Sequence, residues 1–237
     1  MLHNKKLVCF DLDGTLIDSV GIWNQVDAKL IEDLSGQQAD LALIQQQRDL
    51  QLKKFKHCAD PYLEYCGYLK DSYGIESLSQ DDIKKHRYSI SHYFLDHVIQ
   101  LKPQAEMFVQ KLQQSGIQTA ITTTTSFSNI QRYQQNNSLI NSKLNFAKDF
   151  NLILTRENVQ NIKPHPEVYL KALEFFNLQP EECLIIEDSI IGIEAANQAG
   201  IQVAAIYDQY SEHEMTEIKA KADYFVQDFK TLLNFIT

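Results

Sequence analysis

The sequence predicts an α/β protein, a Rossmann-like parallel sheet covered by helices, with an all-α cap domain inserted after the first strand. In the later part of the chain, short apolar runs alternate with helical patterns of about 10–15 residues. The region from about residue 19 to 98 breaks this alternation, because it has no convincing apolar strand. These two observations separate a core domain from an insert.

Six apolar runs are expected to form the strands, because short runs bounded by turn residues are typical of buried strands. They are Leu7–Phe10, Thr119–Thr122, Leu152–Leu154, Leu184–Ile186, Val203–Ile206 and, with a weaker pattern, Tyr224–Val226. Three helices are expected between the later strands, over residues 104–115, 166–176 and 189–199. The first ends before Gly116 and the last before Gly200, and Pro166 opens the second, as helix termini favour.

The insert reads as several amphipathic helices. A chain of 237 residues allows one large domain or a domain that carries a smaller insert. We therefore expect residues 1–18 and 98–237 to form the core domain and residues 19–97 the helical cap. Arg48, Lys53 and Lys54 are expected on a solvated face of this insert.

The chain is acidic, with 22 Lys and Arg against 31 Asp and Glu, a net charge of −9 and a sequence pI of about 5.2. This balance offers no basic surface for a nucleic-acid backbone. No apolar stretch has the length of a membrane span or of a signal-peptide core. Of the four cysteines, Cys9 and Cys183 lie in apolar runs and none forms a CxxC pair. We expect a cytoplasmic monomer or small homo-oligomer with no nucleic-acid or membrane partner.

Two carboxylates follow the first predicted strand. Asp11 and Asp13 lie two residues apart and precede Gly14, so their side chains can face one site if the strand continues. Ligands of open parallel sheets bind beyond the carboxyl ends of the strands, and two acids there favour a cation. A solvated turn is the alternative interpretation of this segment.

Three further segments place polar residues at the end of a predicted strand or beside a turn. Glu187 and Asp188 end another predicted strand, and with Asp11 and Asp13 they form an oxygen-rich set of the kind that Mg²⁺ prefers. The run Thr122–Thr125 ends a third strand where hydroxyls and N–H groups can hold an anion. Lys163 precedes a turn and can neutralise charge among the acids. Each segment alone also fits a structural role. The two acids suit a helix N-terminus, the threonines favour a strand, and the lysine could lie in a surface loop.

Together, and in this order, the four segments resemble the motifs of the haloacid dehalogenase superfamily. The similarity is to the helical-cap branch of this superfamily (C1 type, subfamily IA). Within that branch, the chain resembles the sugar-phosphatase-like and β-phosphoglucomutase-like members. It covers residues 7–19, 101–126, 151–169 and 183–200 closely, whereas the insert matches only in type.

The resemblance implies an aspartyl-phosphate mechanism. Asp11 would be the nucleophile, and Asp13 would protonate the leaving alcohol and then activate water. Mg²⁺ would be held by Asp11, the backbone carbonyl of Asp13 and Asp188, with Glu187 as a further candidate. Thr123, or Thr124 if the register shifts by one, would bind the phosphoryl oxygens together with Lys163.

The resemblance therefore predicts a Mg²⁺-dependent phosphatase for a small phosphorylated metabolite such as a sugar phosphate. A β-phosphoglucomutase-type mutase is the alternative, supported by the Glu187-Asp188-Ser189 segment with Gly192. Against it, Trp23 stands where the compared mutases carry a histidine. A non-catalytic binding protein is disfavoured because no motif residue is missing.

Overall fold

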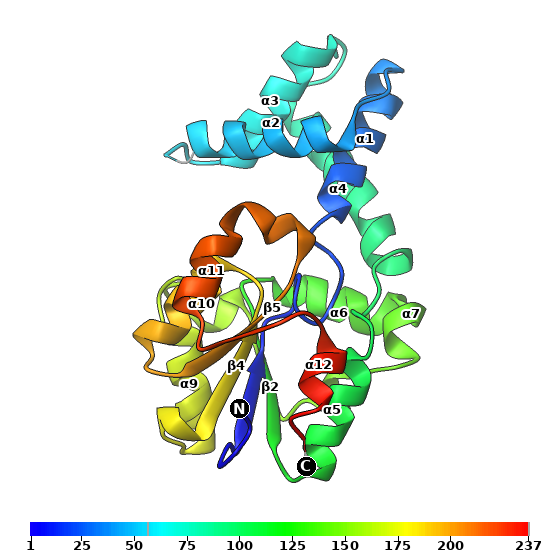
Figure 1. The fold of residues 1–237 in the computed structure, drawn as a ribbon. Helices are drawn as coiled ribbons and strands as arrows, with labels where there is room; N and C mark the ends of the chain where they lie inside the picture. The colour runs from blue at the N-terminus through cyan, green and yellow to red at the C-terminus, as the bar shows by residue number, and fades with distance from the viewer. Residues whose placement is uncertain (56, 237) are drawn as a thin grey trace. The chain divides into compact units, whose positions relative to one another are not determined.

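The computed structural model describes residues 1–55 and 57–236 and divides into two compact units (Figure 1). Met1–Val20 and Ile99–Thr237 form the first, called here the α/β unit, and Gly21–Val98 form the second, called the helical unit. Each unit has a hydrophobic core of its own. The two units are described separately below.

The α/β unit is built on one six-stranded parallel sheet in the order β3-β2-β1-β4-β5-β6. The strands are β1 (Leu7–Phe10), β2 (Gln118–Thr122), β3 (Leu152–Leu154), β4 (Cys183–Glu187), β5 (Gln202–Ile206) and β6 (Tyr224–Val226). All six coincide with predicted apolar runs to within one residue at each end. The predicted α/β class with a parallel sheet is therefore confirmed.

Helices cover both faces of this sheet (Figure 1). On one face lie α9 (Glu167–Phe176), α10 (Ile190–Gln198) and α11 (Met215–Lys221), and on the other α5 (Ala105–Gln114) and α12 (Phe229–Leu233). On the second face, Phe10 contacts Phe108 with ring centroids 6.0 Å apart, and Phe108 contacts Phe229 at 5.7 Å. Both predicted cysteines, Cys9 and Cys183, are buried in the sheet.

The predicted helix ends shift by one residue where the backbone requires it. Gln104 has a φ of +67° and so precedes α5 instead of opening it. Ser189 is the N-cap of α10, because its hydroxyl accepts a hydrogen bond from the Gly192 N–H (3.3 Å).

Shorter elements complete the α/β unit. They are α6 (Phe127–Asn136), α7 (Ser138–Asn141), α8 (Phe146–Asp149) and three 3₁₀ turns, η1 (Arg156–Asn158), η2 (Pro180–Glu182) and η3 (Gln209–Glu214). The two ends of the insertion are joined within this unit. The Asp18 N–H donates to the Gln100 carbonyl (2.9 Å), the Lys102 N–H donates to the Leu16 carbonyl (2.8 Å), and Ile17 forms an antiparallel bridge with Leu101.

The helical unit contains α1 (Ile22–Ser35), α2 (Leu41–Lys54), α3 (Pro61–Tyr73) and α4 (Gln80–His97). Capping side chains begin three of these helices: Asp40, Asp60 and Ser79 each accept a hydrogen bond from a backbone N–H of the first turn. Gly36 and Gly74, both with left-handed backbones, end α1 and α3.

A buried ionic cluster lies among these helices, and it corrects the expectation for Arg48. Asp27 is fully buried and accepts hydrogen bonds from Arg87 (2.5 Å), Arg48 (3.2 Å) and the Tyr65 hydroxyl (3.0 Å). Arg48 is only 9% exposed, because Asp27 and the Asn24 side chain both bind its guanidinium. Lys53 and Lys54 are exposed as expected.

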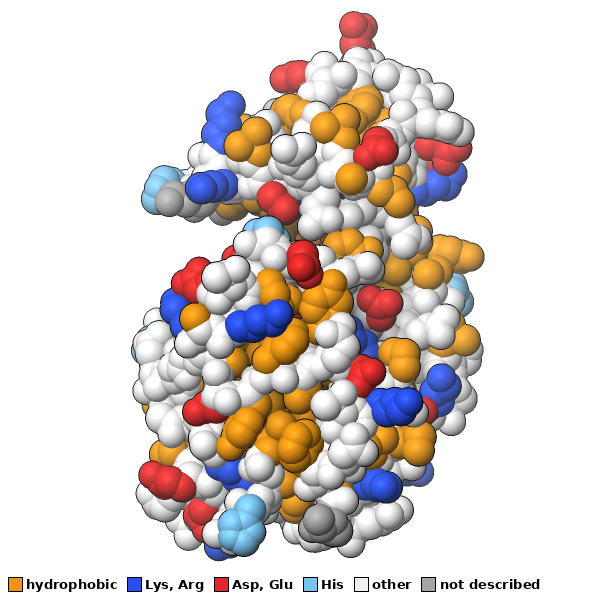
Figure 2. Space-filling view, in the orientation of Figure 1, with side chains coloured by type: hydrophobic (Ala, Val, Ile, Leu, Met, Phe, Trp, Pro, Cys, Tyr) orange, Lys and Arg blue, Asp and Glu red, His pale blue; other side chains and the backbone are white. Residues whose placement is uncertain are grey.

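The surface carries charges of both signs. Figure 2 shows acidic and basic side chains interspersed on the visible face. No helix within the described residues combines the length and the apolar character needed to cross a membrane.

Candidate active site

The candidate site lies where β1, β2 and β4 end. β1 pairs with β4 on one side, with Phe10 opposite Ile186, and with β2 on the other, with Phe10 opposite Ile121. The residues that follow these pairs therefore emerge at one edge of the sheet. The Asp11 N–H extends the pairing by one residue, because it donates to the Ile186 carbonyl (3.0 Å).

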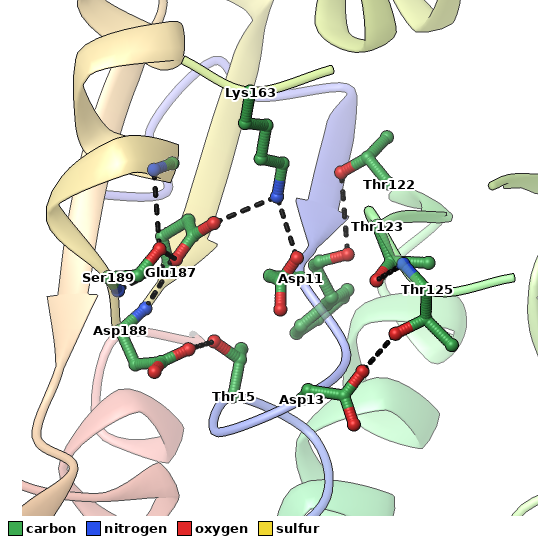
Figure 3. A network of polar contacts seen from close by, with 12 residues as sticks. Asp11, Asp13, Thr15, Thr122, Thr123, Thr125, Lys163, Glu187, Asp188 and Ser189 are labelled. Carbon is green, nitrogen blue, oxygen red and sulfur yellow. Dashed lines mark hydrogen bonds and ion pairs between the residues drawn. The ribbon is translucent and has the colours of Figure 1, made fainter. Parts of the chain in front are cut away.

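Lys163 links two of the predicted acids. Its Nζ donates to Asp11 Oδ1 (2.7 Å) and to Glu187 Oε1 (2.8 Å), as Figure 3 shows. Burial alone would lower the pKa of Lys163, but the charges of Asp11 and Glu187 outweigh it and raise this pKa well above its ordinary value. The lysine is therefore a fixed positive charge beside Asp11.

Asp11 is buried, and its environment opposes ionisation. Desolvation raises its pKa to about 7, helped by the charges of Glu187 and Asp13, while Lys163 acts in the opposite direction. A carboxylate in such a place is poorly stabilised by the protein alone. A cation beside it would favour the charged form.

Glu187 has both carboxylate oxygens occupied. Oε1 accepts from Lys163, and Oε2 accepts from the N–H groups of Asp188 (2.8 Å) and Ser189 (2.9 Å) and from the Ser189 hydroxyl (2.9 Å). A Cβ at Gly192 would lie 1.6 Å from Oε1, so only glycine leaves room for this carboxylate. Glu187 is therefore well placed to hold Lys163. Because its oxygens are already occupied, it is less suited than Asp11 or Asp188 to bind a metal.

Asp188 faces the same site from the end of β4. The Thr15 hydroxyl donates to its Oδ1 (2.7 Å), and burial together with the charges of Glu187 and Asp11 raises its pKa well above the ordinary value. Gly14 adopts a φ of +83°, and a Cβ there would lie 2.3 Å from Asp188 Oδ2. The turn after β1 therefore requires glycine for two reasons: its backbone is left-handed, and a Cβ would collide with the Asp188 carboxylate.

The donor set fits a hard divalent cation. Asp11, Glu187 and Asp188 each offer an oxygen, and these atoms lie within 4.8 Å of one another. Lys163 pairs with the carboxylates of Asp11 and Glu187, and among the described residues Asp188 has no such ion pair, so full ionisation of the three acids leaves excess negative charge in a buried place. Carboxylate oxygens are the ligands that Mg²⁺ prefers. Asp11 and Asp188 are the residues best placed to hold it.

The side chain of Asp13 points elsewhere. Its carboxylate accepts hydrogen bonds from the hydroxyls of Ser19 (2.6 Å) and Thr125, and Figure 3 shows it turned toward Thr125. It is half-buried and is not among the three acids of the cluster. This arrangement leaves the carboxyl of Asp13 available for proton transfer.

The predicted threonines have different positions. The Thr122 hydroxyl donates to the Phe10 carbonyl (3.4 Å), so this residue still belongs to the sheet. Thr123 is buried, and its hydroxyl accepts a hydrogen bond from the Thr125 N–H (3.1 Å). Thr124 is half-buried in the same turn.

Several hydroxyl contacts with the acids were not predicted. Thr15, Ser19 and Thr125 all bind the acids through their hydroxyls. They lie inside or beside the motif segments, which is the signal that would have pointed to them. Tyr169 has no such signal: its ring lies 5.1 Å from Lys163 Nζ, and its buried hydroxyl is the one buried side-chain polar atom without a hydrogen-bond partner among the described residues.

Two proteins with sequences similar to this chain are named as phosphatases. The bifunctional riboflavin kinase/FMN phosphatase of Arabidopsis thaliana is 26% identical over 205 residues, which are 85% of this chain and 49% of that protein, so the chain spans about half of that relative's length. The phosphoglycolate phosphatase of Aquifex aeolicus is 27% identical over 203 residues, which are 84% of this chain and 83% of its own.

A crystal structure from Thermotoga maritima, provisionally assigned as a β-phosphoglucomutase, shares the fold. It superposes with a TM-score of 0.79 at 22% identity, over 98% of this chain and 100% of that one. The profile of the haloacid dehalogenase-like hydrolases matches residues 8–206, a span that contains all the acids of the candidate site and Lys163. The chain therefore belongs to the haloacid dehalogenase-like hydrolase family.

Proposed function

We propose that this protein is a Mg²⁺-dependent phosphatase that hydrolyses a small phosphorylated metabolite, such as a sugar phosphate, through an aspartyl-phosphate on Asp11. The observation that carries the proposal is the buried Asp11 carboxylate, held by Lys163 at 2.7 Å beside the acid cluster at the sheet edge. Family relatives named as phosphatases support the same class of reaction.

In the first step, an oxygen of Asp11 attacks phosphorus and the bond to the leaving alcohol breaks. Asp13 gives its proton to that alcohol oxygen. Lys163 balances the charge of the nucleophile and the phosphoryl group, and the Thr123 hydroxyl, with Thr124 as the next candidate, binds phosphoryl oxygens. A bound Mg²⁺ would add positive charge against those oxygens.

In the second step, the Asp13 carboxylate takes a proton from water, and the resulting hydroxide attacks phosphorus. The acyl phosphate bond breaks, inorganic phosphate leaves, and Asp11 is restored as a carboxylate. One residue thus gives a proton in the first step and regains it in the second. The helical unit is proposed to be a cap that selects the substrate.

The test is release of inorganic phosphate from sugar phosphates, phosphoglycolate, nucleotides and β-glucose 1-phosphate, with Mg²⁺ and with EDTA. Release that requires Mg²⁺ is expected. Asp11→Asn keeps the shape but removes the nucleophilic charge, so we expect it to lose turnover by several orders of magnitude.

Asp71→Asn is the charge-matched control, because Asp71 lies exposed on α3 of the helical unit, and it should retain turnover. Retention of turnover in a folded Asp11→Asn variant would contradict the proposal. Conversion of β-glucose 1-phosphate to the 6-phosphate, with no phosphate release from any compound, would favour a mutase instead.

A further inference from the structure

The segment that carries Lys163 is held by few apolar contacts. It joins η1 to α9, and of residues 160–165 only Lys163 is buried, whereas the other five are exposed. Ile162, the neighbouring apolar residue, is 48% exposed. Apolar burial therefore does little to fix this segment, although Lys163 reaches Asp11 from it at 2.7 Å.

Glu167, the first residue of α9, binds this segment through both of its carboxylate oxygens. Oε1 accepts from the Gln160 N–H (2.9 Å), and Oε2 accepts from the N–H (2.9 Å) and the side-chain amide (3.2 Å) of Asn161. The two backbone hydrogen bonds lower the pKa of Glu167 to about 2, so the carboxylate is charged at neutral pH. These bonds close a loop, residues 160–167, that contains Lys163.

α9 supports the loop at two further points. Lys171, one turn after Glu167, lies 3.1 Å from Glu167 Oε1 and donates through its Nζ to the Asn158 carbonyl. On the same helix, the ring of Tyr169 lies 5.1 Å from the Nζ of Lys163, within the range of a cation–π contact. The helix therefore contacts both the backbone of the loop and the end of the lysine side chain.

We propose that Glu167 is a positioning residue for Lys163, because its carboxylate fixes the backbone from which the ammonium group reaches Asp11. The effect on turnover rests on the proposed phosphatase function. An acid at the first position of a helix also interacts favourably with the helix dipole, but that effect needs only the negative charge. The contacts with Gln160 and Asn161 need the length of the side chain as well.

Two substitutions separate the reach of the side chain from its charge. Glu167→Gln keeps the length but replaces one accepting oxygen by an NH2 group, which cannot accept from a backbone N–H. Glu167→Asp keeps the charge at the start of α9 but is one methylene shorter, so we expect it to lose at least one of the two N–H contacts. Both variants should release the loop.

Glu182→Gln is the matched control. Glu182 likewise accepts a hydrogen bond from a backbone N–H, that of Gln179 (2.9 Å), and pairs with a lysine, Lys6 (2.6 Å). It lies just before β4, whose other end carries the site. This variant therefore removes the same kinds of contact without touching the loop of Lys163.

The first measurement is acylation of Lys163 by an amine reagent, followed by peptide mass spectrometry, on the metal-free protein. The Lys163 side chain is only 2% exposed, so labelling requires local opening of its loop. In both Glu167 variants its labelling rate should rise by about tenfold, the scale of one lost hydrogen bond to a charged group. Lys111, exposed on α5, is the internal standard, and Glu182→Gln should leave the rate unchanged.

The second measurement is kcat for the best substrate of the phosphate-release panel, with the folded content verified by circular dichroism. A displaced Lys163 balances the charge of the transition state less well, so kcat should fall by about tenfold in both Glu167 variants. Glu182→Gln should keep the wild-type kcat.

Unchanged labelling of Lys163 in Glu167→Gln, an equal rise in Glu182→Gln, or wild-type labelling and turnover in Glu167→Asp would each overturn the inference while the phosphatase function stands. Increased labelling with unchanged kcat would also overturn it, because the position of Lys163 would then not matter for the reaction. A wild-type protein that hydrolyses no phosphate ester would overturn the proposed function, and the labelling rates would still show whether Glu167 fixes Lys163.

Discussion

Glu187 shows how one side chain can hold its neighbours in a site in place. Its Oε2 is held by two backbone N–H groups and a hydroxyl, so its Oε1 has a fixed direction toward Lys163. Lys163 in turn presents its charge to Asp11. Asp11 is thus oriented through two layers of contacts, and the outer layer depends on the absence of a side chain at Gly192.

Gly192→Ala should therefore damage the site from a distance. The new Cβ would lie 1.6 Å from Glu187 Oε1, so the carboxylate must move and release Lys163. We expect overpacking to lower the free energy of unfolding by about 1–3 kcal/mol and turnover to fall with it. Chemical denaturation and phosphate release would measure the two effects.

Gly67→Ala is the matched control, because Gly67 is also buried within a helix and the atoms nearest its new Cβ belong to the side chain of the exposed Gln80 (2.4 Å). A flexible side chain can move aside, and alanine favours the helix by up to about 1 kcal/mol. Equal losses in the two variants would show that the position of Glu187 does not matter.

At the residue scale, the sequence predicts polar groups better than it predicts their partners. Asp11, Asp188 and Lys163 are predicted at one site because strand ends meet at one edge of a parallel sheet, and the structure places them together. The contact of the Thr125 hydroxyl with Asp13 could not be predicted in this way. Which hydroxyl of a turn reaches a carboxylate depends on how the turn packs, and no local sequence pattern encodes that.

At the scale of elements, the strands were the most predictable part. Apolar runs buried on both faces mark them, and the structure has all six in one sheet. The short helices α7 and α8, of four residues each, were not predicted, because one turn has too few residues to show a helical period. The burial of the Arg48 side chain could not be predicted, because its acidic partner lies 21 residues away, on another helix.

The ionic cluster of the helical unit leads to a stability prediction. Asp27→Ala would leave two buried guanidinium groups, those of Arg48 and Arg87, without their carboxylate. Removing one partner of a buried ion pair costs about 3–5 kcal/mol, because the remaining charge is desolvated and unpaired. We expect a loss of this size in the free energy of unfolding of the helical unit, measured by denaturant titration with circular dichroism.

Asp33→Ala on the same helix provides the comparison. Asp33 pairs with Lys29 (2.8 Å), but the two side chains are 32% and 50% exposed, and such pairs contribute about 0–1 kcal/mol. Losses of similar size at Asp27 and Asp33 would mean that the buried cluster is not a main source of stability in this unit.

At the scale of the whole molecule, the buried acids link stability to pH and to metal. Asp11 keeps its proton up to about pH 7 in the folded chain, whereas its ordinary pKa is 3.8. The folded state therefore binds more protons over this interval, so the metal-free protein should lose stability as the pH rises through it. A cation would offset this loss once the acids are ionised.

Thermal unfolding with and without Mg²⁺ at pH 5.5 and pH 8 would test this linkage. Protons compete with metal for the same oxygens, so we expect a small shift at the lower pH. At saturating Mg²⁺ and the higher pH, the increase in Tm should be on the order of 5 °C. Asp11→Asn should raise the Tm of the metal-free protein at pH 8 and abolish the shift. A shift of equal size at both pH values would contradict this account.

The paired ends of the insertion have a consequence for how such a chain can vary. Asp18 and Gln100, and Leu16 and Lys102, are bonded side by side within the α/β unit. The helical unit is therefore, in polymer terms, a loop with pinned ends, and doubling the length of a flexible loop costs only about 0.6 kcal/mol of closure entropy. An insert of another length or sequence can occupy this position without disturbing the register of β1 and β2, so the insert can diversify while the sheet edge that carries the acids stays the same.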